Sequence, residues 1–333
     1  MKIDHFDVVL EKEEDSPFIG GDFIVGSVKI NVINKIEISK LTVSLRGIIK
    51  TGWKNKKSSG AIFESVVDIL NETIDLTSQI MKHCDDNNHL QCGLHIISFE
   101  YKLPFAVLSS IEQDNLGCIR YTIQGILEIP EDGFSEIVTE RPILIFSYLN
   151  LDAPHLLNST TVSDQAQINS CCSKCRGTKR FIHTTVTIGQ LGIFPGDQCL
   201  VKIEIDQDPI ISCCNPLKRH KNKERKCISV SFCQQTTFKS RNRYDPKIVD
   251  EKSITLALAS QSFHHDCDIN STIVKDITFD VPNLIPPTTI NDNELISCCY
   301  FFKIFSKNFY IVVPVIVGST RTNIPEKAND LFV

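Results

Sequence analysis

The sequence predicts an all-β protein built from two immunoglobulin-like β-sandwich domains. Short segments in which apolar and polar residues alternate recur along the whole chain, which is the pattern of strands with one buried face. Gly and Pro interrupt these segments at short intervals, as the turns of a sandwich require. A chain of 333 residues, of which 42% are apolar, is long enough to give each of two domains its own core.

The first half of the chain, residues 1–150, is expected to form the N-terminal sandwich. Residues 24–32 and 41–45 place Ile, Val and Leu on one side of an extended strand. Trp53 and Phe63 flank a short basic turn, which predicts a hairpin. Two further expected strands are residues 99–103 and 119–123.

The segment 63–80 is the best helix candidate, because apolar residues there recur at spacings of three and four. Its many Ile, Val and Thr residues favour a long strand over a helix. Trp53 continues the alternation of the strand before it, so the odd-numbered residues of 41–53 share one face. We therefore expect Trp53 to be a buried structural residue rather than one that grips a ligand.

The second half of the chain repeats the same rhythm after a change in composition. Residues 151–170 are polar and small and are expected to be a linker. Residues 171–319 predict the C-terminal sandwich, and residues 320–333 predict a short tail. The expected strands of the second sandwich are residues 184–188, 200–205, 228–232, 254–258, 273–279, 298–305 and 310–317.

Composition limits the class of protein. The formal net charge of −5 argues against a protein that coats nucleic acid. The N-terminus has acidic residues where a signal peptide would have an apolar run, and no stretch approaches the roughly 20 apolar residues of a membrane helix. We expect a cytoplasmic protein, with peripheral association at the plasma membrane or endosomes. In that reducing compartment the 14 cysteines are expected to be free thiols or metal ligands.

Several short motifs occur in a fixed order at the turns between the expected strands. They are Gly21-Asp22-x-x-x-Gly26, Gly47 with Thr51 and Trp53, Leu103-Pro104 with Ser109-Ser110, Gly117 to Tyr121, Cys171-Cys172, Pro195-Gly196-Asp197, and Pro314 to Gly318. The glycines can take positive φ in turns, and proline ends a strand because it cannot donate to the ladder. In this order and spacing the motifs resemble those of the arrestin family, specifically the α-arrestins or arrestin domain-containing proteins, over residues 3–320.

The resemblance implies two arrestin-like domains and a non-catalytic cytoplasmic adaptor without a cofactor. Such an adaptor binds the cytosolic parts of membrane receptors or transporters and directs their endocytosis or intracellular transport. The chain departs from the family pattern where Gly20 replaces a proline, where Gln124 replaces a basic residue and where Asp206-Gln207 replaces an asparagine. Many α-arrestins carry Pro-Pro-x-Tyr motifs that bind the WW domains of ubiquitin ligases. Here Thr-Thr follows Pro286-Pro287, so no such motif supports a ligase partner.

A run of basic residues between two expected strands is the candidate contact for anionic groups. Its cations are Lys218, Arg219, Lys221, Lys223, Arg225 and Lys226. The run can be a solvated hairpin tip, or it can bind anionic lipid headgroups or a phosphorylated tail, to which each cation adds about 1 kcal/mol near an anionic membrane. A nuclear-import signal is a third interpretation. Lys239, Arg241 and Arg243 are expected to extend the patch.

The cysteine clusters allow a different class of function, a zinc- or thiol-dependent protein. Cys171, Cys172 and Cys175 with His183 could supply four zinc ligands, or the cysteines could be small buried apolar residues. Adjacent cysteines on a strand face opposite sides of the sheet and do not easily share one metal. Two further clusters, Cys213-Cys214 with Cys227 and Cys233, and Cys298-Cys299, favour the interpretation as buried apolar residues. The run His264 to Cys267 resembles a set of metal ligands but is expected to be a polar loop, where neighbouring residues rarely converge on one metal.

The motifs favour an adaptor over the other functions considered. We expect recognition by strand addition at an exposed sheet edge and by charge pairing through basic loops. No nucleophile elbow, Walker loop or zinc-protease motif is present in the sequence, so no catalytic residue and no metal site is assigned. The alternatives are a retromer-type sorting subunit, a module that binds only lipid surfaces, and the zinc or thiol protein. No prediction of cargo or oligomeric state follows from these motifs.

Overall fold

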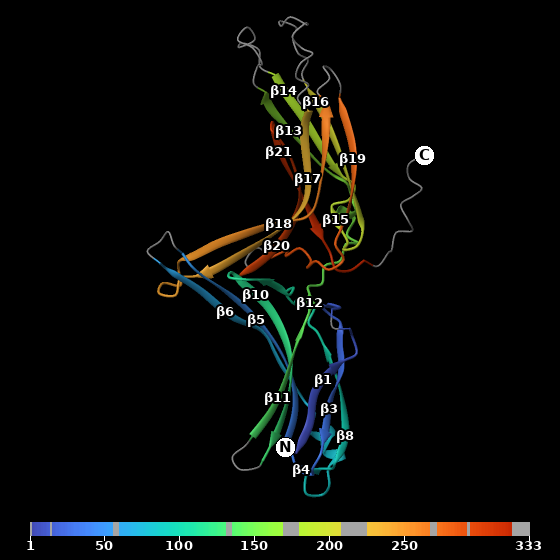
Figure 1. Cartoon of the computed structure of the whole chain (residues 1–333), viewed down its shortest axis with the longest axis vertical. Coiled ribbons are helices and arrows are strands. Elements are labelled where there is room, and N and C mark those ends of the chain that lie inside the picture. The colour runs from blue at the N-terminus through green and yellow to red at the C-terminus, as the bar shows by residue number, and fades with distance from the viewer. Residues whose placement is uncertain are drawn as a thin grey trace, which may run out of the picture. The chain divides into compact units, whose positions relative to one another are not determined.

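A computed structural model describes residues 2–13, 15–55, 60–130, 135–168, 180–207, 225–266, 272–291 and 294–321 (Figure 1). The chain divides into two compact units. The first consists of Met1–Tyr148, Thr237–Lys252 and Asn291–Ser297, and the second consists of Leu149–Thr236, Ser253–Ile290 and Cys298–Val333. Both are built almost entirely of antiparallel strands, which confirms the predicted all-β fold.

The first unit contains two sheets of a sandwich and two small strand pairs. One sheet has the order β1 (Ile3–Leu10), β3 (Phe23–Val32), β8 (Gly93–Lys102). The other has the order β11 (Ser135–Ile143), β10 (Gly117–Ile129), β5 (Lys40–Lys54), β6 (Ile62–Asp75), with β9 (Ile111–Gln113) beside β10. The small pairs are β2 (Phe18–Ile19) with β12 (Ile145–Phe146), and β4 (Ile36–Glu37) with β7 (His89–Leu90). Apolar residues of both sheets form one core.

The segment 63–80 is a strand for most of its length, as its β-branched residues predict. It forms β6, followed by the single-turn helix α1 (Thr77–Ile80) and the 3₁₀ turn η1 (Met81–His83). A bulge in β6 shifts its pairing with β5, because Gly47 lies opposite Leu70 and Ile48 lies opposite Asp68. The ladder between β5 and β10 has no such shift. The alternation of β5 therefore continues to Trp53, which faces the core.

Two glycines of the motifs have conformational roles. Gly21 and Gly196 have φ of 92° and 88°, in the left-handed region that favours glycine, so both predicted Gly-Asp turns are present. Gly47 allows a close approach instead, because a Cβ atom there would lie 2.5 Å from the ring of Tyr121. The hydroxyl of that buried tyrosine donates to the Leu108 carbonyl at 2.8 Å.

The second unit is a sandwich of two sheets. One has the order β13 (Thr160–Ile168), β14 (Arg180–Ile188), β16 (Gln198–Gln207), β19 (Ile273–Asp280). The other has the order β15 (Gly192–Ile193), β21 (Phe309–Val317), β20 (Ile296–Ser306), β17 (Arg225–Arg241), β18 (Val249–Asp266). Phe279 of the first sheet contacts Phe302 of the second edge to face, with ring centroids 5.3 Å apart. Each of the seven expected strands of this half corresponds to one of these strands.

The segment 151–170 differs from the expected linker. It contains the short helix α2 (Pro154–Leu157) and strand β13, which pairs with β14 along its whole length. Its polar composition suits an outer strand, because Thr161 and Ser163 lie exposed and make cross-strand hydrogen bonds with Thr187 and Thr185, both at 3.0 Å. Among the described residues no helix is long and apolar enough to cross a bilayer.

Candidate binding surface

Trp53 is held at the end of β5 by three kinds of contact. Its ring stacks on Phe63 with centroids 6.3 Å apart, and Lys252 Nζ lies 4.9 Å from the ring centroid. Its indole Nε1 donates to Asp250 Oδ2 at 2.9 Å, an oxygen that also accepts from Asn55 Nδ2 at 3.3 Å. Because the side chain is only 8% exposed and its one donor is already paired, the expected burial of Trp53 is confirmed.

The acceptor for Trp53 comes from a distant segment, residues 237–252, which the first unit includes. Thr51 Oγ1 donates to the Lys239 carbonyl at 2.9 Å, and the Arg243 amide donates to the Ile62 carbonyl at 2.9 Å. These bonds fasten residues 237–252 to the ends of β5 and β6. The environment of the hairpin therefore depends on residues almost 200 positions further along the chain.

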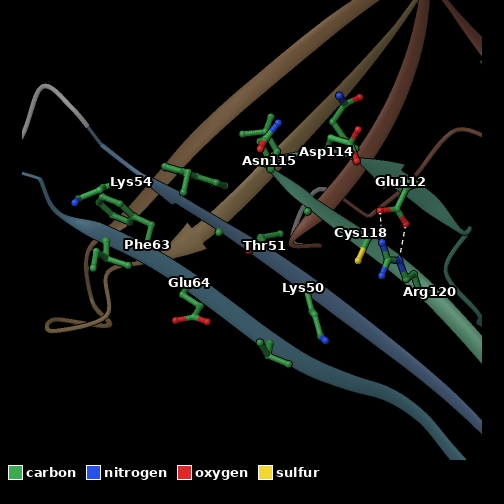
Figure 2. Close-up of a pocket in the computed structure, with 17 residues that line it drawn as sticks. Lys50, Thr51, Lys54, Phe63, Glu64, Glu112, Asp114, Asn115, Cys118 and Arg120 are labelled. Atoms are coloured by element: carbon green, nitrogen blue, oxygen red, sulfur yellow. Dashed lines mark hydrogen bonds and ion pairs between the residues drawn. The ribbon is translucent and has the colours of Figure 1, made fainter.

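A groove of about 600 Å³ opens beside this hairpin, and we call it the hairpin groove (Figure 2). Residues 50–54, 62–64, 66, 112–118 and 120 line it. Strand register places Lys50, Glu64 and Arg120 on one face of the sheet, on three neighbouring strands. Figure 2 shows these side chains beside one another, with Cys118 between Lys50 and Arg120.

The charges of the hairpin groove are only partly paired. Arg120 Nε and Nη2 donate to the two carboxylate oxygens of Glu112, both at 2.6 Å, and these hydrogen bonds raise the pKa of Arg120 above its ordinary value. Lys50 and Lys54 are exposed and make no ion pair with any residue that the structure describes. The two lysines are therefore available to an anionic group of a partner.

A second groove, of about 570 Å³, follows the outer edge of β6, and we call it the edge groove. Residues 49, 64–67, 69, 241–243, 246, 294 and 295 line it. At one end of β6 the residues 241–243 occupy the edge: Asn242 forms an antiparallel bridge to Phe63, and the Arg241 amide donates to Ser65 Oγ at 3.1 Å. Beyond Ser65, β6 has no second strand partner among the described strands.

Two apolar side chains are exposed where the edge of β6 opens. Val66 is 57% exposed and Val67 is 43% exposed, on opposite faces of the strand. The rest of β6 carries four carboxylates and no cation, at Glu64, Asp68, Glu72 and Asp75. The edge groove therefore offers backbone groups without a strand partner, exposed valines and acidic side chains. An extended segment of a partner could pair with these backbone groups and contact these side chains.

The predicted basic run lies mostly outside the described residues. Positions 218–224 are not described, and Arg225 and Lys226 begin strand β17. Lys239 and Arg241, which were expected to extend the patch, lie in strand β17, and Arg241 and Arg243 line the edge groove.

The cysteines that the structure describes do not form a metal site. Among the described residues no group of three or more His, Cys, Asp or Glu side chains could hold a metal ion. Burial raises the pKa of the Cys118 thiol, and it raises that of Cys199 to about 12, so both stay protonated at neutral pH. Cys298 is buried and Cys299 exposed, as expected for neighbours on a strand.

The remaining candidate ligands do not come together in the described residues. Cys171, Cys172, Cys175, Cys213, Cys214 and Cys267 lie outside those residues. His183 and Cys227 are exposed, and Cys233 is buried. The run at His264 is not a loop as expected, because residues 264–266 complete strand β18.

Sequence reasoning missed both grooves. Their walls come from segments far apart in the chain, and no local pattern indicates that 241–243 would lie against β6. One signal was available in the sequence: Val66 and Val67 are neighbouring β-branched residues between the carboxylates of Glu64 and Asp68. Strict alternation would bury one of the pair, whereas both are exposed.

Comparison with known proteins agrees with this architecture. Residues 6–152 match the model of the arrestin (or S-antigen) N-terminal domain, and residues 179–321 match that of the C-terminal domain. The chain is also similar to arrestin domain-containing protein 17 of Caenorhabditis elegans, with 20% identity over 328 residues that cover 96% of this chain and 71% of that protein. The two domain models match successive parts of the chain, and together they cover most of it. The chain therefore belongs to the arrestin family.

Proposed function

We propose that the chain is a non-catalytic adaptor that binds extended cytosolic segments of membrane receptors or transporters and directs their endocytosis or intracellular transport. Arrestin-domain proteins act in general as trafficking adaptors. The observation that carries the proposal for this chain is the open edge of β6 beside the edge groove. An adaptor needs a surface that recognises peptide segments, and an open strand edge is one.

Strand addition to β6 is supported by the residues that already pair with one end of its outer edge. Arg241 and Asn242 lie against β6, and the Arg243 amide donates to the Ile62 carbonyl at 2.9 Å. A cargo segment would continue this pairing from Val66 onward. Main-chain hydrogen bonds would supply much of the affinity, and alternate side chains would supply specificity.

The side chains of β6 favour a cargo segment of a particular chemistry. Val66 and Asp68 share one face of the strand, and Val67 lies on the other. A segment that places an apolar residue against each valine and a Lys or Arg beside Asp68 would make favourable cross-strand pairs, each of about 0.2–1 kcal/mol. Cytosolic segments that follow a membrane helix are rich in Lys and Arg, which suits this acidic edge.

Membrane proximity would add to this recognition. The basic run 218–226 carries six cations, and each contributes about 1 kcal/mol of attraction to an anionic membrane surface. Together they would hold the chain at the inner leaflet, where cytosolic segments of cargo are found. Lys50 and Lys54 of the hairpin groove would attract anionic groups on the cargo itself.

Proximity labelling in cells tests the proposal, with the intact chain fused to a labelling enzyme. The wild type is expected to label the cytosolic parts of membrane proteins. Val66→Asp should reduce that labelling, because it removes the apolar contact that the cargo segment would make with Val66. The matched control is Val138→Asp on β11, the strand at the opposite edge of the same sheet, where the valine is 52% exposed.

Two outcomes of this experiment would contradict different parts of the proposal. A wild-type labelled set without membrane proteins would contradict the adaptor function. A set that contains membrane proteins but is reduced equally by Val66→Asp and Val138→Asp would contradict recognition at the edge of β6. Binding to anionic liposomes in the absence of any cargo, with no labelled membrane proteins, would favour a module that binds only lipid surfaces.

A further inference from the structure

Two histidines meet in the first unit, between the turn that follows β6 and the outer strand β8. His83 ends the 3₁₀ turn η1, and His95 lies near the start of β8. Their Nδ1 atoms are 3.5 Å apart, and the two rings contact each other edge to face. The pair lines neither the hairpin groove nor the edge groove, and the proposed function does not use it.

The backbone between the two histidines folds back on itself and brings them together. Cys84 forms an antiparallel bridge to Leu90, and the Asn88 amide donates to the Asp85 carbonyl at 3.0 Å, which closes the turn between them. Gly93, with φ of 129°, then begins β8 in a conformation that favours glycine. The position of one ring relative to the other is therefore set by this local fold.

His95 presents an unprotonated nitrogen to His83. Its side chain is only 8% exposed, and its Nε2 donates to the Gln91 carbonyl at 2.8 Å. Because a carbonyl oxygen can only accept, Nε2 carries the proton of the neutral ring and Nδ1 carries a lone pair. Metal-binding histidines are oriented in the same way, since their second ring nitrogen donates to a backbone carbonyl or a carboxylate.

The separation of the two Nδ1 atoms suits a shared metal ion better than a hydrogen bond. Hydrogen bonds of N–H donors span about 2.7–3.2 Å, which is less than the 3.5 Å between these atoms. Two nitrogens bound at about 2.0–2.1 Å to one tetrahedral zinc ion lie about 3.3–3.4 Å apart. The pair would have to close by only about 0.1–0.2 Å to bind such an ion.

We propose that His83 and His95 bind a divalent transition-metal ion such as zinc through their two Nδ1 atoms. Imidazole nitrogen is a preferred ligand of these ions. Among the described residues no third His, Cys, Asp or Glu completes the set, so water would fill the remaining positions. The ion would fasten η1 to β8, where the chain passes from one sheet of the sandwich to the other.

The cysteine next to His83 is not a ligand in this arrangement. Cys84 Sγ donates to the Ile80 carbonyl at 3.6 Å. Burial raises the pKa of this thiol, so it stays protonated at neutral pH, whereas a metal ligand must be a thiolate. The site therefore rests on the two imidazoles alone.

NMR spectroscopy of the full chain, labelled with ¹⁵N in histidine, tests the site atom by atom. Titration with zinc chloride in reducing buffer should shift the Nδ1 resonances of His83 and His95 together and leave Nε2 of His95 protonated. A local readout is needed because the 14 cysteines and the other histidines also take up zinc. His83→Gln changes an exposed side chain and should weaken zinc binding at His95 about tenfold or more, since it removes a direct ligand.

His5→Gln is the matched control, because His5 is an exposed histidine on β1 of the same unit. It should leave the zinc response of His83 and His95 unchanged, and circular dichroism melting verifies that each variant is folded. The proposal is overturned if the two Nδ1 resonances do not shift at up to about 1 mM zinc. It is also overturned if His95 responds equally in folded His83→Gln, or if His5 responds at the same zinc concentration as the pair.

Discussion

Truncation of Trp53 tests how the hairpin of β5 and β6 is held. Trp53→Ala removes a ring that is 8% exposed, stacked on Phe63 and bonded through Nε1 to Asp250. Truncating a buried tryptophan costs about 3–5 kcal/mol. For a unit of this size each kcal/mol lowers the melting temperature by about 2–4 °C, so a fall of about 6–20 °C is expected.

Trp53→Phe separates packing from the hydrogen bond. The phenyl ring keeps most of the contact with Phe63 and loses the donor to Asp250, which still accepts from Asn55. A hydrogen bond to a charged group contributes about 1.5–3 kcal/mol, and partial exposure of Asp250 places this one at the low end. The fall in melting temperature should therefore be a fraction of that of Trp53→Ala.

Differential scanning calorimetry is the appropriate assay, because Trp53 is the only tryptophan and its removal also removes the fluorescence signal. Tyr244→Ala is the matched control: this aromatic side chain belongs to the same unit and is 81% exposed, so its loss should change stability by about 0.5 kcal/mol or less. A Trp53→Ala variant that melts like the wild type but no longer binds a partner would refute the structural role and make Trp53 a contact residue.

Three further predictions concern other parts of the chain. Gly47→Ala should destabilise the first unit by about 1–3 kcal/mol, because its Cβ would lie 2.5 Å from the buried ring of Tyr121. Gly52→Ala should be tolerated, because the nearest atom to its Cβ would lie 3.4 Å away. The melting temperatures of the two variants test this difference. A hydrogen bond from Lys35 at 2.5 Å lowers the pKa of Asp85 to about 2, and NMR titration of Lys35→Met should return it toward about 3.9. Because that folded-state pKa is depressed, the contribution of Asp85 to stability is present above about pH 4 and is lost as the pH falls toward 2. Replacing the six cations of 218–226 by Gln should leave the melting temperature unchanged and should abolish the salt-sensitive binding to anionic liposomes. If liposome binding is unchanged, the run contributes only to solubility.

Local sequence patterns were sufficient to predict the strands and the face of the sheet on which Trp53 lies. In β5 every odd-numbered residue from Leu41 to Trp53 is buried, and the bulge that could have reversed the pattern lies on β6 instead. The Gly-Asp turns were also predictable, because positive φ at Gly21 and Gly196 is a local requirement. The family resemblance rested on such turn motifs, and the two matching domain models confirm it.

Tertiary contacts could not be predicted in the same way. The partner of Trp53 is Asp250, 197 positions away, and nothing near either residue indicates the other. The polar segment 151–170 has the composition of a linker, yet it contains β13, because an outer strand needs little apolar surface. One wall of the edge groove exists only because 237–252 returns to β6.

Hydrogen–deuterium exchange of the intact chain tests most directly the claim that cargo adds a strand to β6. The exchange of backbone amides would be compared with and without the cytosolic segment that proximity labelling enriches most. The account predicts slower exchange at residues 66–72 of β6, because their free edge would become hydrogen-bonded, and no such change with Val66→Asp. Protection that appears elsewhere while 66–72 exchange at the unbound rate would contradict it.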